Sequence, residues 1–343
     1  MLYAATRNDR DAYTVHRMLR DGRSPDGGLF VPFRLPTLPE EEVLALGSVN
    51  FNTCTANILN LLFGTHLTGY DIDLHLGHFP VRLLHLNQRI VLAECWHNLR
   101  WQFARMEECL IALVKPDAMP SCEGAWEKVG VRIAVLFGIF GELIRCGCAD
   151  RENPVDISMV CGDFSAPMAA WYARAMGLPI GNIVCCCNAN SNLWDFICHG
   201  QMRTDGVAVQ TAVPEGDVVV PVGIERLIFS CCGAEEACRF AECLHRGKTY
   251  YLDDRLLQNL RKGIYVTVSS DRRILQTIPS ACATHGCVLS PSSALAYAGL
   301  EDYRARTAES RRALVMTDVS PKQCLGAVAA AMGVGEEELK RIL

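Results

Sequence analysis

The pattern of hydrophobic positions changes near residue 154 and predicts the core of the fold. Residues 155–161 and 182–187 are near-continuous apolar runs, a pattern typical of strands buried on both faces of a parallel sheet. Each run precedes a stretch with helical periodicity, at 166–176 and 192–198, that ends at glycine or proline. This alternation predicts an open α/β fold, whose ligands lie beyond the carboxyl ends of the strands.

Patterns elsewhere along the chain predict further elements. The first 95 residues have a loop-rich pattern with turn signals at 25–28 and 35–39, and a short helix is predicted at 11–19. The other predicted elements are a hairpin at 82–86 and 90–94, helices at 99–114, 125–144, 234–245 and 271–278, and strands at 264–268 and 313–316. We therefore predict two regions, residues 1–95 and residues 96–343.

Composition and charge exclude several classes of protein. Half of the residues are apolar and 21% are charged, which is the balance of a globular protein with a sizeable core. A net charge of −5 argues against nucleic acid as a partner, because phosphate binding needs a concentrated positive surface. No apolar run reaches the ~20 residues of a membrane helix. The charged first twenty residues do not match a signal peptide. We expect a soluble, cytoplasmic protein with no membrane partner.

The chain contains 18 cysteines, but no two are spaced as Cys-x-x-Cys. A structural zinc site therefore has no sequence framework, and no metal site is predicted. Cys161 and the run 185–187 lie within the apolar stretches, where cysteine behaves as a small hydrophobic residue. We expect these thiols to be buried in strands.

Several sequence blocks resemble one family in their order and spacing. Thr6-Arg7 precedes DGGLFVP at 26–32, and paired glycines there allow a tight turn into an apolar strand. Further blocks read AWYARAMGLPI at 170–180, NANS at 188–191, IERLIF at 224–229, LSPSSA at 289–294 and MT at 316–317. These blocks resemble threonine synthases, which are pyridoxal phosphate enzymes of fold type II. The family converts O-phosphohomoserine into threonine and phosphate.

The resemblance identifies where the family's Schiff-base lysine would lie. The family reads ELFHGPTxAFKD, and residues 94–105 here read ECWHNLRWQFAR. Ala104 stands at the lysine position, and His97 remains in register as a remnant. Only six lysines occur in the chain, and Lys115 lies eleven residues further on. That is about 16 Å along a helix. Alanine supplies no amine for a Schiff base, so no catalytic residue is expected.

Two more departures from the family concern the cofactor and the substrate. Only ten residues, 115–124, separate the predicted helices 99–114 and 125–144, where the family has a cofactor-facing subdomain. The family's phosphate loop reads Gly-Asn-Phe-Gly, whereas this chain has Gly162, Asp163, Phe164 and Ser165. We expect Asp163 to cap the following helix and to repel a phosphate dianion.

These departures predict a degenerate, truncated fold-type-II protein with no bound pyridoxal phosphate. Remnant ligand-binding candidates are Gly162, Asp163, Phe164, Ser165, Asn188, Asn190 and Thr317. Three functions stay open. The chain is a non-catalytic pseudoenzyme that binds a small metabolite or a partner, a pyridoxal phosphate lyase that uses an unexpected lysine, or a structural partner of a complete threonine synthase.

Loss of the subdomain is expected to uncover the carboxyl ends of the strands, near Gly162, Asn188 and Thr317. Either the N-terminal region or a second copy of the chain then covers the opening. We predict a homodimer formed through the apolar helix at 129–144, and expect charges at Phe137 or Phe140 to split it.

Overall fold

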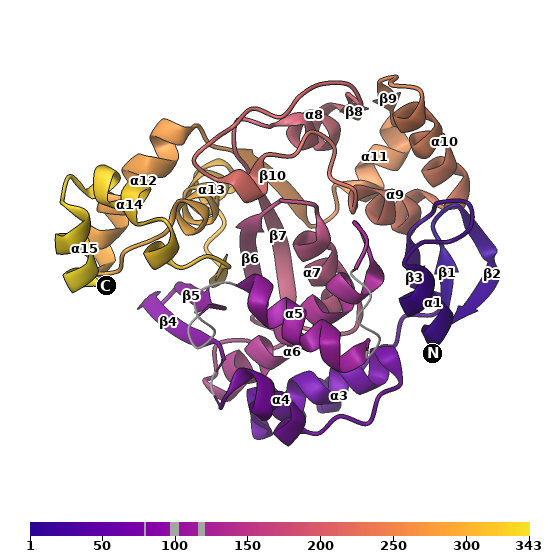
Figure 1. The fold of residues 1–343 in the computed structure, drawn as a ribbon, viewed down its shortest axis with the longest axis horizontal. Coiled ribbons are helices and arrows are strands. Elements are labelled where there is room, and N and C mark those ends of the chain that lie inside the picture. The colour runs from indigo at the N-terminus through magenta and orange to yellow at the C-terminus, as the bar shows by residue number, and fades with distance from the viewer. Residues whose placement is uncertain (79, 97–102, 116–120) are drawn as a thin grey trace.

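A six-stranded, mainly parallel sheet forms the centre of the molecule (Figure 1). The computed structural model describes residues 1–78, 80–96, 103–115 and 121–343. In spatial order the strands are β10 (Ile264–Val268), β7 (Ile180–Cys187), β6 (Val155–Val160), β11 (Ala313–Thr317), β5 (Ile90–Glu94) and β4 (Arg82–Asn87). All neighbouring strands are parallel except β4, which forms an antiparallel hairpin with β5.

Strands β6 and β7 confirm the prediction made from the two apolar runs. They are parallel neighbours, with Met159 opposite Cys185 in the register. Alternate residues of β7 pack into different hydrophobic clusters, because Cys185 and Cys187 join one while Cys186 joins the other. Both faces of the sheet are therefore covered, and these cysteines fill space as small apolar groups, as expected.

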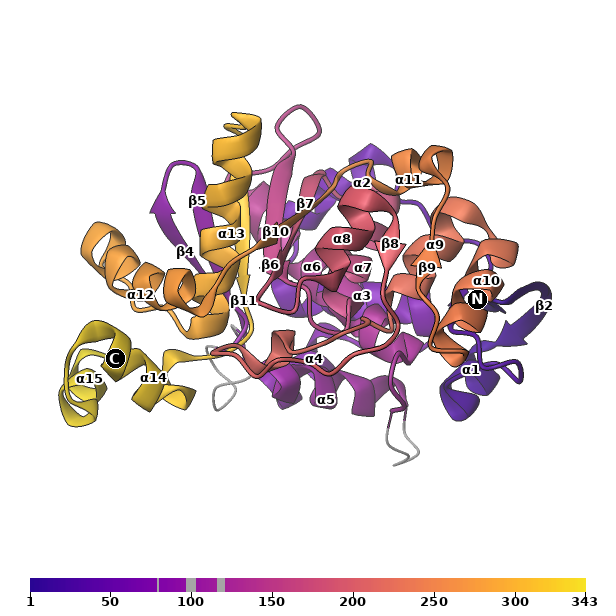
Figure 2. The ribbon, with the colours of Figure 1, turned by 90° about the horizontal axis from the view of Figure 1, so that it is seen from above.

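Helices form a layer on each side of the sheet (Figure 2). Helix α13 (Pro291–Thr307) lies against β6, β7 and β11, and α12 (Asp271–His285) packs on α13. On the other side α7 (Ser165–Ala175) packs on β6 and β7, and α6 (Trp126–Arg145) packs on α7. The predicted fold class, a mainly parallel sheet flanked by helices, is confirmed.

Helix α6 is covered from within the same chain, by α3 (Phe51–Phe63) as well as by α7. Phe137 and Phe140 are fully buried. A Cβ at Gly138 would lie 2.6 Å from the ring of Phe51, so the glycine allows the two helices to approach closely. The argument for a dimer through this helix is therefore wrong, because its apolar positions already have partners. Whether the chain forms a homodimer by another surface stays a prediction.

The N-terminal region contains more regular structure than its turn signals predicted. Its antiparallel sheet has the order β2-β1-β3 and consists of β1 (Leu2–Ala5), β2 (Asn8–Thr14) and β3 (Phe30–Pro32). The helix predicted at 11–19 begins later, as α1 (Val15–Asp21), because Thr14 caps it by accepting from the Arg17 amide. The predicted loop-rich character is wrong for residues 40–76, which contain α2 (Glu40–Ala45), α3 and α4 (Gly69–Leu76).

Most other predicted elements occur close to their expected positions. The remaining elements are α5 (Phe103–Val114), α8 (Asn192–His199), α9 (Ile224–Cys232), α10 (Ala234–His245), α11 (Asp254–Leu260), α14 (Leu325–Met332), α15 (Glu336–Ile342), β8 (Gln201–Met202), β9 (Tyr250–Tyr251) and short 3-10 turns at Leu46–Ser48, Pro214–Gly216 and Pro321–Gln323. The proposed boundary at residue 95 stays a prediction, and β5, just before it, pairs with β11 in the central sheet.

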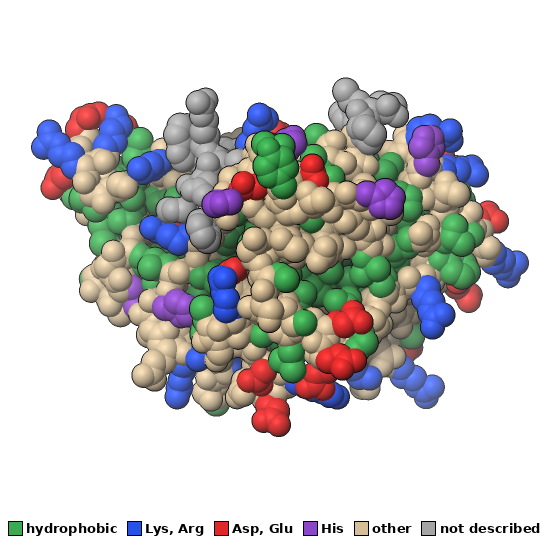
Figure 3. Space-filling view, turned by 90° about the horizontal axis from the view of Figure 1, so that it is seen from below, with side chains coloured by type: hydrophobic (Ala, Val, Ile, Leu, Met, Phe, Trp, Pro, Cys, Tyr) green, Lys and Arg blue, Asp and Glu red, His purple; other side chains and the backbone are tan. Residues whose placement is uncertain are grey.

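The surface and the helix lengths bear on the predicted partners. In the described part of the chain, every helix is too short or too polar to cross a membrane. On the face seen from below, Lys and Arg side chains are scattered among acidic and apolar ones rather than gathered in one patch (Figure 3). That nucleic acid is not a partner stays a prediction.

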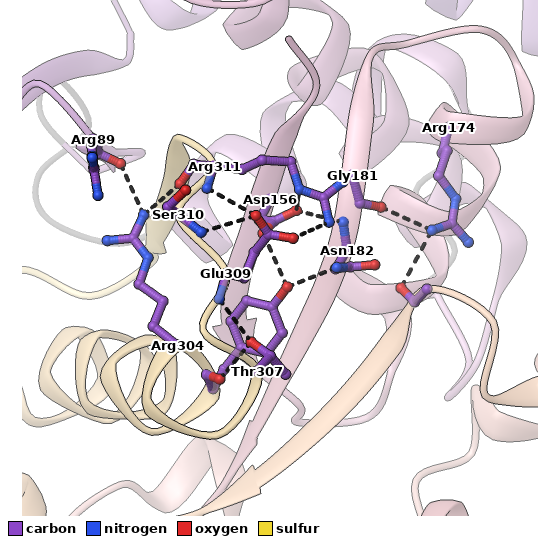
Figure 4. Close-up of polar contacts among 12 residues, drawn as sticks. Arg89, Asp156, Arg174, Gly181, Asn182, Arg304, Thr307, Glu309, Ser310 and Arg311 are labelled. Atoms are coloured by element: carbon purple, nitrogen blue, oxygen red, sulfur yellow. Dashed lines mark hydrogen bonds and ion pairs between the residues drawn. The ribbon is translucent and has the colours of Figure 1, made fainter. Parts of the chain in front are cut away.

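A polar network closes the amino end of the sheet (Figure 4). Asp156, the second residue of β6, is buried; its carboxylate accepts from the Asn182 amide at 2.7 Å and from the Tyr303 hydroxyl at 3.1 Å. Arg311 lies 3.6 Å from the same carboxylate. The network joins β6, β7, α13 and the loop before β11. These hydrogen bonds and the nearby Arg311 stabilise the negative charge of the buried Asp156.

Candidate functional site

A cavity of about 470 Å³ opens at the carboxyl ends of β6 and β11. Its wall is formed by the start of α5, the middle of α6, the turn between β6 and α7, and the segments after β11 and around Glu215. The lining residues are Phe103, Ala104, Arg132, Val135, Leu136, Met159, Val160, Cys161, Gly162, Asp163, Ser165, Ala166, Ala169, Glu215, Val218, Ser292, Met316, Asp318 and Val319. This is the edge of the sheet where an open α/β fold is expected to bind its ligands.

The turn from β6 into α7 positions the polar groups of the cavity. Gly162 and Phe164 both have positive φ, 48° and 70°, and the fully buried Phe164 ring anchors the turn. The Phe164 amide donates to the Cys161 carbonyl at 2.9 Å, and the Gly223 amide donates to the Asp163 carbonyl at 2.9 Å. A left-handed conformation is uncommon for phenylalanine, so packing and hydrogen bonds must hold the turn in place.

Asp163 precedes Phe164, the N-cap of α7, and bonds the first helical residue instead of being the cap that the sequence predicted. Its Oδ1 accepts from the Ser165 amide at 2.9 Å and from the Ser165 hydroxyl at 2.5 Å. Burial acts to raise the pKa of Asp163. The charge of Arg132, the Ser165 hydrogen bonds and the charge of Lys128 outweigh burial and hold this pKa below its usual value. The carboxylate is therefore ionised at neutral pH and lies on the cavity wall.

Arg132 is the centre of the charged part of the wall. Its Nε donates to Glu107 at 3.0 Å and its Nη1 to Asp318 at 3.4 Å, while its guanidinium lies 4.5 Å from the centroid of the Phe103 ring. Burial acts to lower the pKa of Arg132. The negative charges of Glu107, Asp318 and Asp163 outweigh this effect and raise the pKa above its ordinary value. Arg132 therefore stays protonated, and its positive charge is already paired with Glu107 and Asp318.

Asp318 differs from Asp163 in its balance of forces. Burial raises the pKa of Asp318, and the opposing pull of Arg132 does not fully offset it. Its Oδ1 is buried and has no hydrogen-bond partner among the described residues. Ionised Asp318 is therefore less favourable in the folded protein than in water. The side chain borders the cavity and is 34% exposed.

The residues of this cavity do not fit pyridoxal phosphate, the group that the resemblance implies. Ala104, at the family's lysine position, lines the cavity, and no lysine is found among its described lining residues. Lys115 is engaged elsewhere: it is buried and its Nζ lies 3.2 Å from Glu127. The Ser165 amide, which a phosphate would need at the start of α7, already donates to Asp163.

The structure separates the other predicted site residues from the cavity. The Asn188 side chain donates to Thr211, to the Val213 carbonyl and to Asp217 at 2.8–3.1 Å, and Asn190 joins the same network. These hydrogen bonds hold the segment next to Glu215 in place. Thr317 is buried, and its hydroxyl donates to the Ala93 carbonyl at 2.8 Å. His97 lies outside the described residues.

Sequence analysis missed three of the charged lining residues, Arg132, Glu215 and Asp318. One signal was present: Arg132 interrupts an apolar run that is otherwise buried in the core. It is the one charged residue within 129–141, where every other residue is buried, and a lone charge in such a stretch indicates a partner or a polar cavity. Asp318 directly follows the last residue of β11, a position that also indicates the carboxyl edge of the sheet.

Comparisons with known proteins agree on one family. Residues 2–75 match the sequence profile of the threonine synthase N terminus. Threonine synthase-like 1 of Pongo abelii is 27% identical over 176 residues, which are 50% of this chain and 23% of that protein. Threonine synthase-like 2 of Xenopus laevis is 26% identical over 219 residues, 63% of this chain and 43% of that protein. The matched region thus spans about a quarter to less than half of these relatives.

Solved structures show the same fold. The pyridoxal phosphate-bound threonine synthase from Brucella melitensis superposes with a TM-score of 0.82 at 18% identity, over 97% of this chain and 92% of that chain. The yeast threonine synthase has the same TM-score at 16% identity, over 99% and 93% of the two chains. The chain is similar to threonine synthases in part of its sequence and in its fold. The resemblance in sequence motifs is confirmed by these independent matches.

Threonine synthase-like motifs that are about 200 residues apart in the sequence, Thr6-Arg7 and 224–229, meet at one junction. Thr6 donates to Glu225 at 2.5 Å, and Arg7 donates to both oxygens of the same carboxylate at 3.0 and 2.9 Å. The buried Arg226 donates to the Phe30 carbonyl at 3.0 Å and to the Gly124 carbonyl at 2.6 Å. These motifs therefore hold the N-terminal sheet on α9, a structural task that does not need the cofactor.

Proposed function

We propose that this threonine synthase-like chain is a non-catalytic protein that works by binding a small molecule in the cavity at the strand ends. The observation that carries the proposal is Ala104, which places a methyl group on the cavity wall where the resemblance expects an amine. A Schiff base needs a lysine within reach of the cofactor. Asp163 adds a like charge where a cofactor phosphate would bind.

The cavity itself supports binding as the retained activity. Its volume, about 470 Å³, is within the range of small-molecule sites, and most of its wall is apolar with a few charged groups. The wall is made by helices and strand ends rather than by one exposed loop. Such a wall is largely formed before a ligand arrives, which lowers the ordering cost of binding.

The test is a reduction experiment with pyridoxal phosphate. Purified protein is mixed with the cofactor, an absorbance spectrum is recorded, borohydride is added, and peptides are analysed by mass. We expect no stoichiometric pyridoxyl adduct on any of the six lysines. Lys128 is the lysine to inspect first, because it lies close enough to Asp163 for its positive charge to help lower the pKa of that carboxyl. A stoichiometric adduct there or on another lysine would favour the lyase alternative and overturn the proposal.

A matched variant separates the missing lysine from the other departures. Ala104→Lys returns an amine to the cavity wall, but only residues 115–125 join α5 to α6. That short connection replaces the subdomain in which the family binds the substrate's carboxylate. We expect the variant to release no phosphate from O-phosphohomoserine, with or without added pyridoxal phosphate. Turnover would show that the lysine alone was missing.

A further inference from the structure

The charges around the cavity are unbalanced. Four charged residues line it: one cation, Arg132, and three carboxylates, Asp163, Glu215 and Asp318. Arg132 does not neutralise all of them, because it also donates to Glu107, a carboxylate behind the wall. Lys128 contributes one more positive charge near Asp163. Carboxylates remain in excess by two over these six groups, so the cavity has a negative potential.

Hydrogen bonds fix the orientation of the Asp163 carboxylate through only one of its two oxygens. Both of its hydrogen bonds within the described part of the chain, from the Ser165 amide and hydroxyl, end on Oδ1. The other oxygen, Oδ2, makes no hydrogen bond within the described part of the chain. Its position on the wall leaves that oxygen as an acceptor for a group inside the cavity. An ionised carboxylate accepts from a cation more strongly than from a neutral donor.

Asp318 provides a second, independent sign of a missing partner. Its Oδ1 is buried without a hydrogen bond, although native structures satisfy most buried polar atoms. Its other oxygen has one contact, with Arg132 at 3.4 Å, which is long for a charge-assisted hydrogen bond. A cation bound in the cavity would reduce the cost of keeping Asp318 ionised.

The rest of the wall is apolar. Phe103, Val135, Leu136, Met159 and Val160 present hydrocarbon and sulfur surface to the same space. A fully hydrated inorganic ion would gain nothing from this surface. A molecule that combines a hydrocarbon body with one positive group would bury apolar area and pair with the carboxylates at the same time.

We propose that the cavity selects a small organic ammonium ion with an apolar body, whose positive group pairs with the carboxylate of Asp163 and is supported by Asp318 and Glu215. The inference deepens the proposed binding function and rests on it. It also reverses the charge preference that the resemblance implies, since the family's substrate and cofactor carry phosphate. The lowered pKa of Asp163 agrees with it, because that carboxylate is charged over the physiological pH range.

The test uses three probes of one shape and different charge: cyclohexylmethylamine, which is cationic at pH 7, neutral cyclohexylmethanol, and anionic cyclohexanecarboxylate. Binding to the whole protein is measured by calorimetry and thermal shift. We expect the amine to bind at least tenfold more tightly than the alcohol, and the carboxylate to bind more weakly than both. Equal or tighter binding of the carboxylate would overturn the inference and leave small-molecule binding as the function.

Variants locate the binding event. Asp163→Asn should weaken binding of the amine at least tenfold and leave the alcohol unchanged. Asp254→Asn, at an exposed position in the first turn of α11, is the control and should change neither. Ala104→Trp should reduce binding of both probes, because it fills the cavity from an exposed helix position. Tight amine binding that survives Asp163→Asn and Ala104→Trp would place the site elsewhere and refute the inference.

The two proposals fail in different ways. Absence of binding by all three probes would overturn the inferred ligand class, whereas the borohydride experiment independently decides whether the chain forms a Schiff base. A lysine adduct together with amine binding would overturn the non-catalytic proposal and keep the charge preference of the cavity.

Discussion

Carboxylates lie at both ends of the central sheet, in different settings. At the amino end Asp156 accepts from Asn182 and Tyr303, one on each carboxylate oxygen, and lies beside Arg311 (Figure 4). At the carboxyl end, Asp163 and Asp318 border an open volume of about 470 Å³. Both ends carry charge into a predominantly apolar region, but only the carboxyl end leaves carboxylate oxygens without protein partners.

This difference distinguishes a structural network from a binding site. A buried charge that is completely paired stabilises one arrangement of its neighbours and leaves nothing for a ligand. Charges that are held in place but incompletely paired cost stability, and proteins accept that cost mainly where a ligand supplies the missing partner. The junction of Thr6, Arg7 and Glu225 resembles the amino end in this respect, because its hydrogen bonds use both carboxylate oxygens.

The largest expected effect is at the amino end. Asp156→Ala should lower the free energy of unfolding by about 3 kcal/mol, because it removes the acceptor of the Asn182 backbone amide and of the Tyr303 hydroxyl. Asp156→Asn is the matched control. It should cost less, since an amide oxygen still accepts from Asn182 and burial raises the pKa of Asp156. Urea unfolding measures both; equal losses, or a loss within 0.5 kcal/mol for alanine, would contradict the structural role.

The carboxyl end should respond to neutralisation with opposite signs at its two aspartates. A lowered pKa means that ionised Asp163 stabilises the fold above pH 3.8, and this contribution is lost as the pH falls through the lowered folded-state pKa. A raised pKa means that ionised Asp318 destabilises the fold. This contribution is absent below pH 3.8 and develops as the pH rises through the raised folded-state pKa.

At pH 7, Asp163→Asn should therefore lower the free energy of unfolding by about 0.3–1 kcal/mol, the value of a negative charge near a helix N-terminus, because the amide oxygen still accepts from Ser165. Asp318→Asn should raise the melting temperature by about 2 °C. Thermal melts from pH 3 to pH 8 check both signs, because each difference from the parent protein should shrink towards the acid end. Destabilisation by both variants would show that the carboxyl end is a completed network like the amino end.

The smallest effect comes from placing charge at the cavity wall. Ala104→Lys should raise the melting temperature by about 1–2 °C, because the ammonium group reaches the excess carboxylates. Ala104→Glu should lower it by a similar amount. The two substitutions have similar helix propensity, so their difference reports the electrostatic potential. Scanning fluorimetry at low and high salt is the measurement. An unchanged difference at 1 M salt would mean that charge is not its origin.

The sequence by itself determined the architecture around the sheet. Residues 155–161 and 182–187 are apolar on both faces, and only a parallel sheet covered by helices satisfies such strands. It also determined that Ala104 supplies no amine and that Asp163 bonds the first amide of α7, since residue identity and local hydrogen bonding decide both. The helices at 40–76 were not predicted, because the turn signals at 25–28 and 35–39, which precede them, favoured a loop-rich interpretation of the whole region.

Only the tertiary structure decided which charges meet. Arg132, Glu215 and Asp318 are separated by 83 and 103 residues in the sequence, and no local pattern brings them to one wall. It likewise decided that Phe137 and Phe140 are buried within the chain, in a helix that packs against α3 and α7. Asn188 and Asn190 follow β7 at the expected edge, yet they bind a neighbouring segment rather than the cavity. Position along a strand predicts the edge a residue occupies, whereas packing of distant segments determines what it faces.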